Sequence, residues 1–122
     1  MKKYIIAAAG SDQSGIVAAL SKALFDIGAN REDTTMCQLE DHFMVMMMVQ
    51  STHDLEALRQ ALKDATAKFG LMLNVYSTTV QTERLKRSGT PWLMSVTCLD
   101  QTGVIYQVTH LLTQWQANIY QL

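Results

Sequence analysis

The stretch YIIAAAGSDQSGIV, residues 4–17, recurs later in the chain as WLMSVTCLDQTGVI, residues 92–105. The two stretches are offset by 100 − 12 = 88 residues, and the same offset aligns Ala29-Asn30 with Ala117-Asn118. An apolar strand-like run, an Asp-Gln-(Ser/Thr)-Gly turn and a later Ala-Asn that recur in one register indicate an internal repeat. The chain therefore holds one full copy of a structural unit and the beginning of a second.

The first copy consists of two strand–helix–strand units. Apolar and alternating patterns predict strands over residues 3–9, 30–39, 42–50 and 71–79. Apolar residues at helical spacing predict helices from Ile16 to Ile27 and from Leu55 to Phe69, each followed by a glycine. We expect Asp12 or Ser14 to cap the first helix, and Ser51 to Asp54 to form a capping box for the second. The order βαββαβ predicts an α+β, ferredoxin-like sandwich with both helices on one face of the sheet.

A polar segment separates the two copies. Residues 81–91 (QTERLKRSGTP) are charged and end in Gly-Thr-Pro, which is typical of a linker. We therefore expect one domain over residues 1–80, a linker over 81–91 and the N-terminal part of a second domain over 92–122. For that part we predict a strand over Trp92–Cys98, a helix over Gly103–Trp115 and the opening of a strand at Asn118. The second copy stops where the first has reached Thr34, so 80 − 34 = 46 residues of it have no counterpart in the sequence.

Composition places the chain among globular proteins. Of its 122 residues, 48% are hydrophobic, and ten Lys and Arg balance eleven Asp and Glu. The net charge of −1 provides no overall positive field for nucleic acid or an anionic membrane, and no apolar run approaches the roughly 18 residues of a membrane span. Two distant cysteines and three scattered histidines offer no zinc-ligand spacing. We expect a cytoplasmic protein without a metal or other cofactor.

Methionines occupy both faces of the predicted strand Phe43-Met-Val-Met-Met-Met-Val49. Helices cover only one side of such a sheet, so Met44, Met46 and Met48 would lie on its open side. Burying a methionine is worth about 1.5–3 kcal/mol, so exposing three forgoes roughly 4.5–9 kcal/mol, against a total domain stability of ~5–15 kcal/mol. We predict that these three methionines form an interface, covered by the second copy of the fold, by another molecule of the chain or by a partner.

The turn Asp12-Gln13-Ser14-Gly15 places a carboxylate, two polar side chains and a glycine before a helix. Free helix amides attract a carboxylate, and glycine permits close approach of the backbone. Asp12 can accept from an ammonium group, and Asn30 at the start of the next strand offers a donor and an acceptor. An amino acid would therefore find complements to both of its charges. The alternative interpretation is structural, since Asp or Ser before a helix is most often a cap.

The turns DQSGIV and DQTGVI, the later GAN and QAN segments and the element order resemble those of the ACT domain, a small regulatory module. Two copies joined by a charged linker resemble the tandem ACT proteins of the glycine cleavage system transcriptional repressor group. The resemblance implies that a small amino acid such as glycine or serine binds between paired modules. The positions so implied are Asp12, Gln13, Ser14, Gly15 and Asn30, and in the second copy Asp100, Gln101, Thr102, Gly103 and Asn118. Two positions depart from the family pattern: Arg31 replaces an aliphatic residue that the second copy keeps as Ile119, and Gln116 stands where the first copy has Gly28.

Catalytic patterns are missing from the sequence. Neither a nucleophile with its base, a phosphate-binding loop nor paired catalytic carboxylates can be assembled. The alternative to a free-standing regulator is an ACT fragment of an enzyme such as formyltetrahydrofolate deformylase or phosphoserine phosphatase. RNA-binding sheets of this fold display aromatic and basic residues, whereas the strand after Phe43 offers methionines and no Lys or Arg.

We therefore predict a non-catalytic regulator that senses a small amino acid. Binding would shift the chain between arrangements of paired ACT modules or of a homo-oligomer. The chain would control gene expression or a partner, such as a transcription regulator, through protein–protein contacts, without binding nucleic acid or membrane directly.

Overall fold

The computed structural model describes residues 1–78, 89–99 and 101–122. The chain divides into two units, Met1–Arg84 and Leu85–Leu122, and each is considered by itself. The first unit contains β1 (Lys2–Ser11), α1 (Ile16–Asp26), β2 (Asn30–Leu39), β3 (His42–Ser51), α2 (Leu55–Thr66), a 3₁₀ turn (Ala67–Phe69) and β4 (Met72–Thr78). This order confirms the predicted βαββαβ fold.

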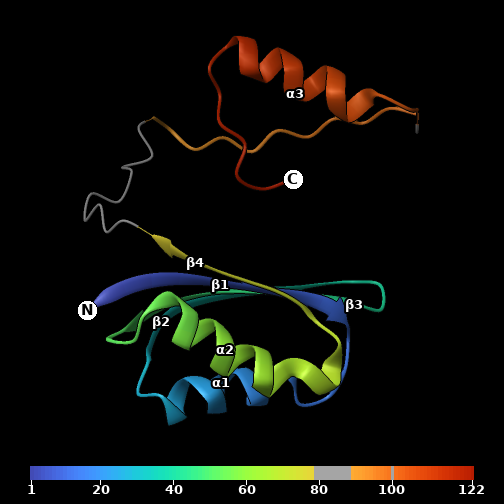
Figure 1. Cartoon of the computed structure of the whole chain (residues 1–122). Helices are drawn as coiled ribbons and strands as arrows, with labels where there is room; N and C mark the ends of the chain where they lie inside the picture. Colours follow the sequence, from blue (N-terminus) through green and yellow to red (C-terminus); the bar gives the residue numbers. More distant parts are fainter. Residues whose placement is uncertain (79–88, 100) are drawn as a thin grey trace. The chain divides into compact units, whose positions relative to one another are not determined.

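The strands form one antiparallel sheet in the order β2-β3-β1-β4. The central strands are β1 and β3, and Ile6 lies between Met47 of β3 and Val75 of β4. Helices α1 and α2 cover one face of this sheet, as Figure 1 shows. The ferredoxin-like sandwich predicted from the sequence is therefore correct.

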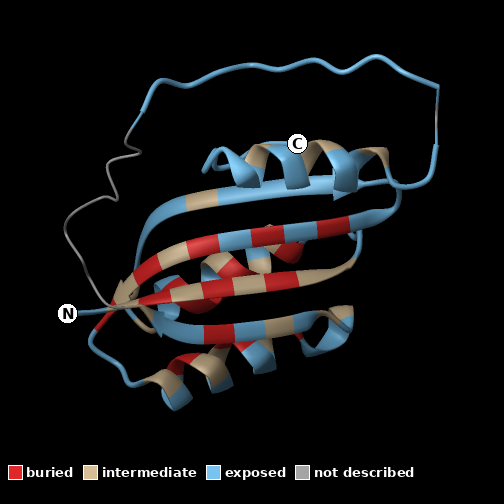
Figure 2. Ribbon diagram, turned by 90° about the horizontal axis from the view of Figure 1, so that it is seen from above, coloured by how far each residue is buried: buried red, intermediate tan, exposed pale blue. Residues whose placement is uncertain are grey.

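The core of the first unit lies between the sheet and the two helices. Burial alternates along β3, where Phe43, Val45, Met47 and Val49 face the helices, and the same alternation is visible along β1 (Figure 2). The side chains that meet them come from one apolar stripe on each helix. They include Leu20, Leu24, Leu58 and Leu62. Period-two strands and period-3.6 helices thus supply one shared apolar layer.

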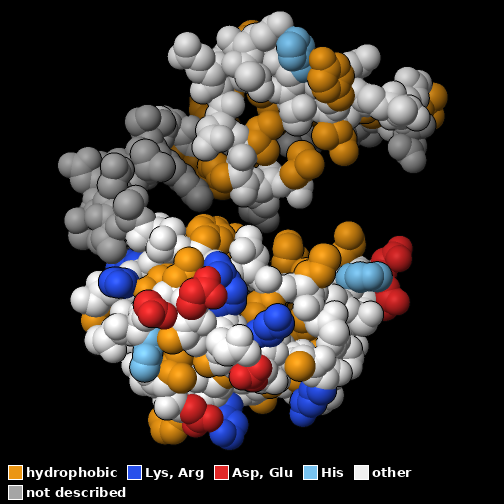
Figure 3. All heavy atoms as spheres, viewed as in Figure 1, with side chains coloured by type: hydrophobic (Ala, Val, Ile, Leu, Met, Phe, Trp, Pro, Cys, Tyr) orange, Lys and Arg blue, Asp and Glu red, His pale blue; other side chains and the backbone are white. Residues whose placement is uncertain are grey.

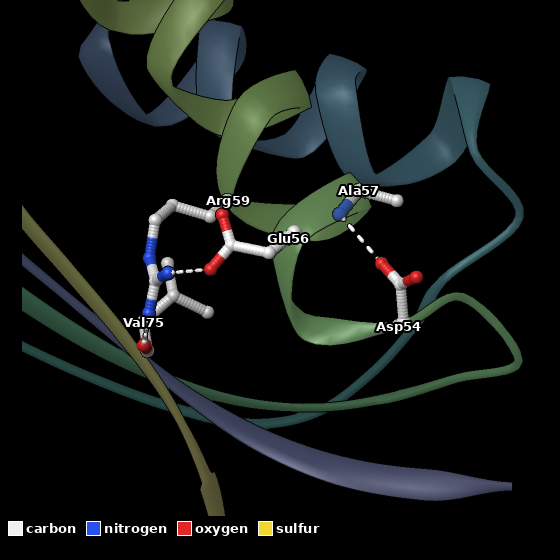
Figure 4. A network of polar contacts seen from close by, with 5 residues as sticks. All are labelled: Asp54, Glu56, Ala57, Arg59 and Val75. Atoms are coloured by element: carbon white, nitrogen blue, oxygen red, sulfur yellow. Dashed lines mark hydrogen bonds and ion pairs between the residues drawn. The ribbon is translucent and has the colours of Figure 1, made fainter.

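The starts of both helices differ from the predicted capping. Gly15 is the residue before α1, with φ 93°, and no side chain caps this helix, so the prediction of an Asp12 or Ser14 cap is wrong. Asp54 itself caps α2, because its Oδ1 accepts from the Ala57 amide at 2.8 Å (Figure 4). Ser51, which was expected to play that part, accepts instead from the His53 amide at 3.1 Å.

The second unit contains α3 (Val104–Gln114), preceded by Gly103 with φ 90° and without a side-chain cap. The predicted helix is confirmed with its ends shortened by one residue each. The predicted strand over Trp92–Cys98 and the strand opening at Asn118 are wrong, since the described residues there form no strand. A strand requires a hydrogen-bonded neighbour. In the first unit β1 pairs with β3 and β4, whose counterparts in the repeat would fall beyond residue 122.

Candidate ligand-binding turn

The turn between β1 and α1 is exposed and is held by three other segments of the first unit. The Asp12 amide donates to the Asp41 carbonyl at 2.8 Å, and Asp12 Oδ2 accepts from Gln38 Nε2 at 2.5 Å. Gln13 Nε2 donates to the Phe69 carbonyl at 3.1 Å. The turn is thereby fixed against the end of β2, the β2–β3 turn and the 3₁₀ segment.

The amides at the start of α1 have no side-chain acceptor. No side chain caps the helix, and its first turn carries no acidic residue. Gly15 has no side chain that would block approach of a ligand to its backbone. The space beside it is also open, because a Cβ built there would have one atom within 4 Å, Phe69 Cζ at 3.8 Å. Helix-start amides favour an anion, and the carboxylate of Asp12, in the turn that precedes them, is an acceptor for a cation. This arrangement can hold the carboxylate and the ammonium of one amino acid.

Asn30 does not join this turn within one copy of the fold. Asn30 pairs with Gln50, which pairs with Lys3 near the start of β1, whereas the turn follows Ser11 at the end of β1. The separation is 11 − 3 = 8 residues of β1, or about 26 Å at the rise of an extended strand. The strand order therefore places Asn30 and the turn at opposite ends of the sheet.

In the second unit, Gln101, Thr102 and Gly103 lead into α3 as their counterparts lead into α1. Both glycines are left-handed and both helices start without a side-chain cap. Asn118 is exposed, and Asp100 lies outside the described residues. The turn of the first copy thus recurs in backbone conformation as well as in sequence.

The open face of the sheet carries the three methionines singled out from the sequence. Met44 is 52% and Met46 48% exposed, and Met48 is partly buried. A groove of about 210 Å³ runs beside Met44, with the small side chains of Ala7 and Ala9 along it and Met72 of β4 on the far side. The sequence reasoning missed Met72, although the alternation of residues 71–79 places it on this face.

Charges of both signs are interspersed on the side of the first unit seen in Figure 3. Among the residues that the structure describes, no three His, Cys, Asp or Glu side chains come together as metal ligands. No helix within residues 1–78, 89–99 and 101–122 is both long and apolar enough to cross a membrane.

The sequence analysis also missed Gln38, which positions Asp12 from 26 residues away.

Residues 2–76 match the family model of the ACT domain. The chain belongs to the ACT domain family. A UPF0237 family protein from Streptococcus mutans is 30% identical over 80 residues, which cover 64% of this chain and 91% of the relative. Nearly the whole of that relative therefore aligns with this ACT domain protein.

Two solved structures are similar to this ACT domain protein over most of its length. An unknown protein from Galdieria sulphuraria has a TM-score of 0.71 and 25% identity, covering 98% of this chain and 68% of that one. A candidate glycine cleavage system transcriptional repressor has a TM-score of 0.65 and covers 94% of this chain and 67% of that one. Its identity is 17%, so the similarity concerns the fold alone.

Proposed function

We propose that this ACT domain protein is a non-catalytic regulator that binds a small amino acid at the turn Asp12–Gly15. The observation that carries the proposal is the turn itself, which is held by Gln38, Asp41 and Phe69 while the amides of α1 keep no side-chain acceptor. A rigid turn with unsatisfied donors is pre-organised for a carboxylate. The same turn recurs before α3, as a repeated binding site would.

The ligand would be held by complementary charges. Its carboxylate would accept from the amides at the start of α1, and its ammonium would donate to Asp12 Oδ1. Ser14 is exposed and its hydroxyl can serve either group. Gln13 is engaged with Phe69 and would shape the turn.

A paired module would supply Asn30. Since Asn30 lies at the far end of the sheet from its own turn, only a neighbour that runs in the opposite direction can bring it to this site. We assign one module to residues 1–80, a linker to 81–91 and the start of a second module to 92–122. Asp100, Gln101, Thr102, Gly103 and Asn118 would form the equivalent half-sites there.

Regulation would follow from a change in pairing. A ligand that bridges two modules stabilises one arrangement of the pair and so alters the affinity for a partner. Met44, Met46 and Met48 offer the surface for such contacts, because methionine adapts to different packing partners. The partner would be a protein in the cytoplasm, such as a transcription regulator. The mixed charges in Figure 3 favour a protein over a nucleic acid as the partner.

Titration calorimetry with a panel of amino acids at millimolar concentration tests the proposal. We expect binding by the full chain and its loss in Asp12→Ala. The matched control is Asp41→Ala, which removes a nearby carboxylate whose polar contact among the described residues is with His42. Absence of heat with every amino acid would contradict the proposal, as would equal loss of binding in both variants.

A further inference from the structure

Sulfur-bearing side chains from two strands meet on the open face of the sheet. Met44 and Met46 lie on this face of β3, and the register of β2 with β3 places Cys37 directly opposite Met44. Directly opposite residues share a face, with Cβ atoms about 4.5–5.5 Å apart, and diagonal neighbours lie within reach of long side chains. Met46 is a diagonal neighbour of Cys37. A thiol and two thioethers are therefore grouped at one place on the sheet.

An imidazole lies beside these sulfur atoms. His42 is two residues before Met44 on β3, hence on the same face, and it is the other diagonal neighbour of Cys37. Its Nδ1 lies 2.9 Å from Asp41 Oδ1. An ionised carboxylate can only accept, so Nδ1 donates its proton to Asp41 and Nε2 keeps a free lone pair. Histidines that bind a metal through one ring nitrogen almost always bond a carboxylate, carbonyl or water through the other.

The chemistry of these donors selects a soft metal ion. Thiolate and thioether sulfur favour Cu(I), and imidazole also binds copper. Zinc sites use cysteine, histidine and carboxylate ligands, and the described residues bring no three such side chains together. The sequence analysis considered zinc ligands only, so it did not detect a group that depends on Met44 and Met46.

The donors are accessible to an ion from solvent. Cys37 is a free, exposed cysteine, and the side chains of Met44 and Met46 are about half exposed. Ala9 of β1 lies opposite Met44 on its other side, where the small alanine leaves a groove along the sheet. The Met44 thioether can therefore turn toward Cys37 without displacing a packed neighbour.

We propose that the open face of the sheet binds one Cu(I) ion between β2 and β3. The donors are a thiolate, two thioethers and an imidazole nitrogen: Cys37 Sγ, Met44 Sδ, Met46 Sδ and His42 Nε2. Binding requires the thiolate, so the Cys37 thiol releases its proton to water as the ion binds, and the thiolate balances the charge of Cu(I). All four donors belong to a single copy of the fold and none belongs to the turn Asp12–Gly15. The metal site is therefore independent of the amino-acid site proposed above.

Titration of the reduced full chain with Cu(I) tests the site, in competition with a coloured Cu(I) chelator and without oxygen. We expect one Cu(I) per chain, with binding weakened about tenfold or more in Cys37→Ser and in Met44→Leu, which keeps the side-chain volume. The matched controls are Cys98→Ser and Met36→Leu, which change an exposed cysteine and an exposed methionine outside the group and should bind as the original chain does. Absence of competition with the chelator overturns the proposal. One ion per two chains, or equal losses in the controls, also overturns it.

Asp41→Ala tests the part assigned to His42. Without the carboxylate on Nδ1, the imidazole loses the bond that fixes its tautomer and orientation. We expect Cu(I) affinity to fall about 10–100-fold while one ion per chain still binds. Unchanged affinity would contradict the assignment of His42 as a ligand.

Ag(I), a diamagnetic substitute for Cu(I), locates the ion by NMR of chains with ¹³C-labelled methionine methyl groups. The methyl signals of Met44 and Met46 should shift on addition of one equivalent. Those of buried Met47 and of Met36, which lies opposite Val45 on the other face, should stay in place. Shifts at Met36 or Met47 as large as those at Met44, or an unshifted Met44, would contradict the proposed site.

Discussion

Replacing Gly15 with alanine tests whether a ligand approaches the backbone of the turn. Gly15 has φ 93° and ψ 0°, a conformation that residues with a Cβ rarely adopt. The nearest atom to an added Cβ is Phe69 Cζ at 3.8 Å, so the methyl group itself fits. The cost is therefore conformational, about 1–2 kcal/mol. For a domain of this size that corresponds to roughly 4–8 °C in Tm for each kcal/mol.

Gly28→Ala is the matched control. Gly28 follows α1 with φ 67°, and nothing lies within 4 Å of an added Cβ, so the same conformational cost applies at the other end of the helix. Thermal unfolding followed by circular dichroism should show similar losses for both variants. Calorimetry should show amino-acid binding lost only in Gly15→Ala, whose methyl group stands at the helix-start amides. Equal binding by the two variants would refute the reasoning about backbone approach.

Two further predictions concern the sheet and the helix cap. Met47→Ala should lower the free energy of unfolding, measured by urea denaturation, by about 2–5 kcal/mol, because Met47 is fully buried. Met46 is half-exposed, so Met46→Ala should lower it by less than half as much. Equal losses in the two variants would mean that the buried and open faces of β3 are wrongly assigned. Asp54→Ala should lower the free energy of unfolding by about 1 kcal/mol in the same assay, because it removes the cap of α2. Asp54→Asn should lower it much less, because asparagine also caps helices. An Asp54→Ala variant as stable as the original chain would disprove the cap.

The fold could be predicted from the sequence because its periodicities are unambiguous. Alternation from Phe43 to Val49 and the 3-4 spacing from Leu55 to Phe69 define which side chains are buried, and β2 has the predicted bounds Asn30–Leu39. Helix capping could not be predicted in the same way. The Asp12 carboxylate bonds Gln38 across the sheet, a tertiary competitor that local patterns do not reveal. The strand over Trp92–Cys98 failed for a related reason, because strand propensity alone supplies no neighbouring strand.

The candidate site was only partly accessible to sequence reasoning. The repeat pointed to the turn and to Asn30, but their places at opposite ends of the sheet follow from the strand order β2-β3-β1-β4. Likewise the bond from Arg59 to the Val75 carbonyl joins residues 16 apart through the packing of α2 on β4. Contacts between elements thus decide which residues a ligand or a second copy can reach.

Amide chemical shifts of the full chain provide the most direct test of the central claim. On addition of an amino acid that the chain binds, the amides of Gly15, Ile16 and Val17 should shift strongly and saturably, together with that of Asn30. Those of α2 should move little. Saturable shifts confined to other parts of the sheet or helices, with the turn unchanged, would contradict a regulatory site at the start of α1.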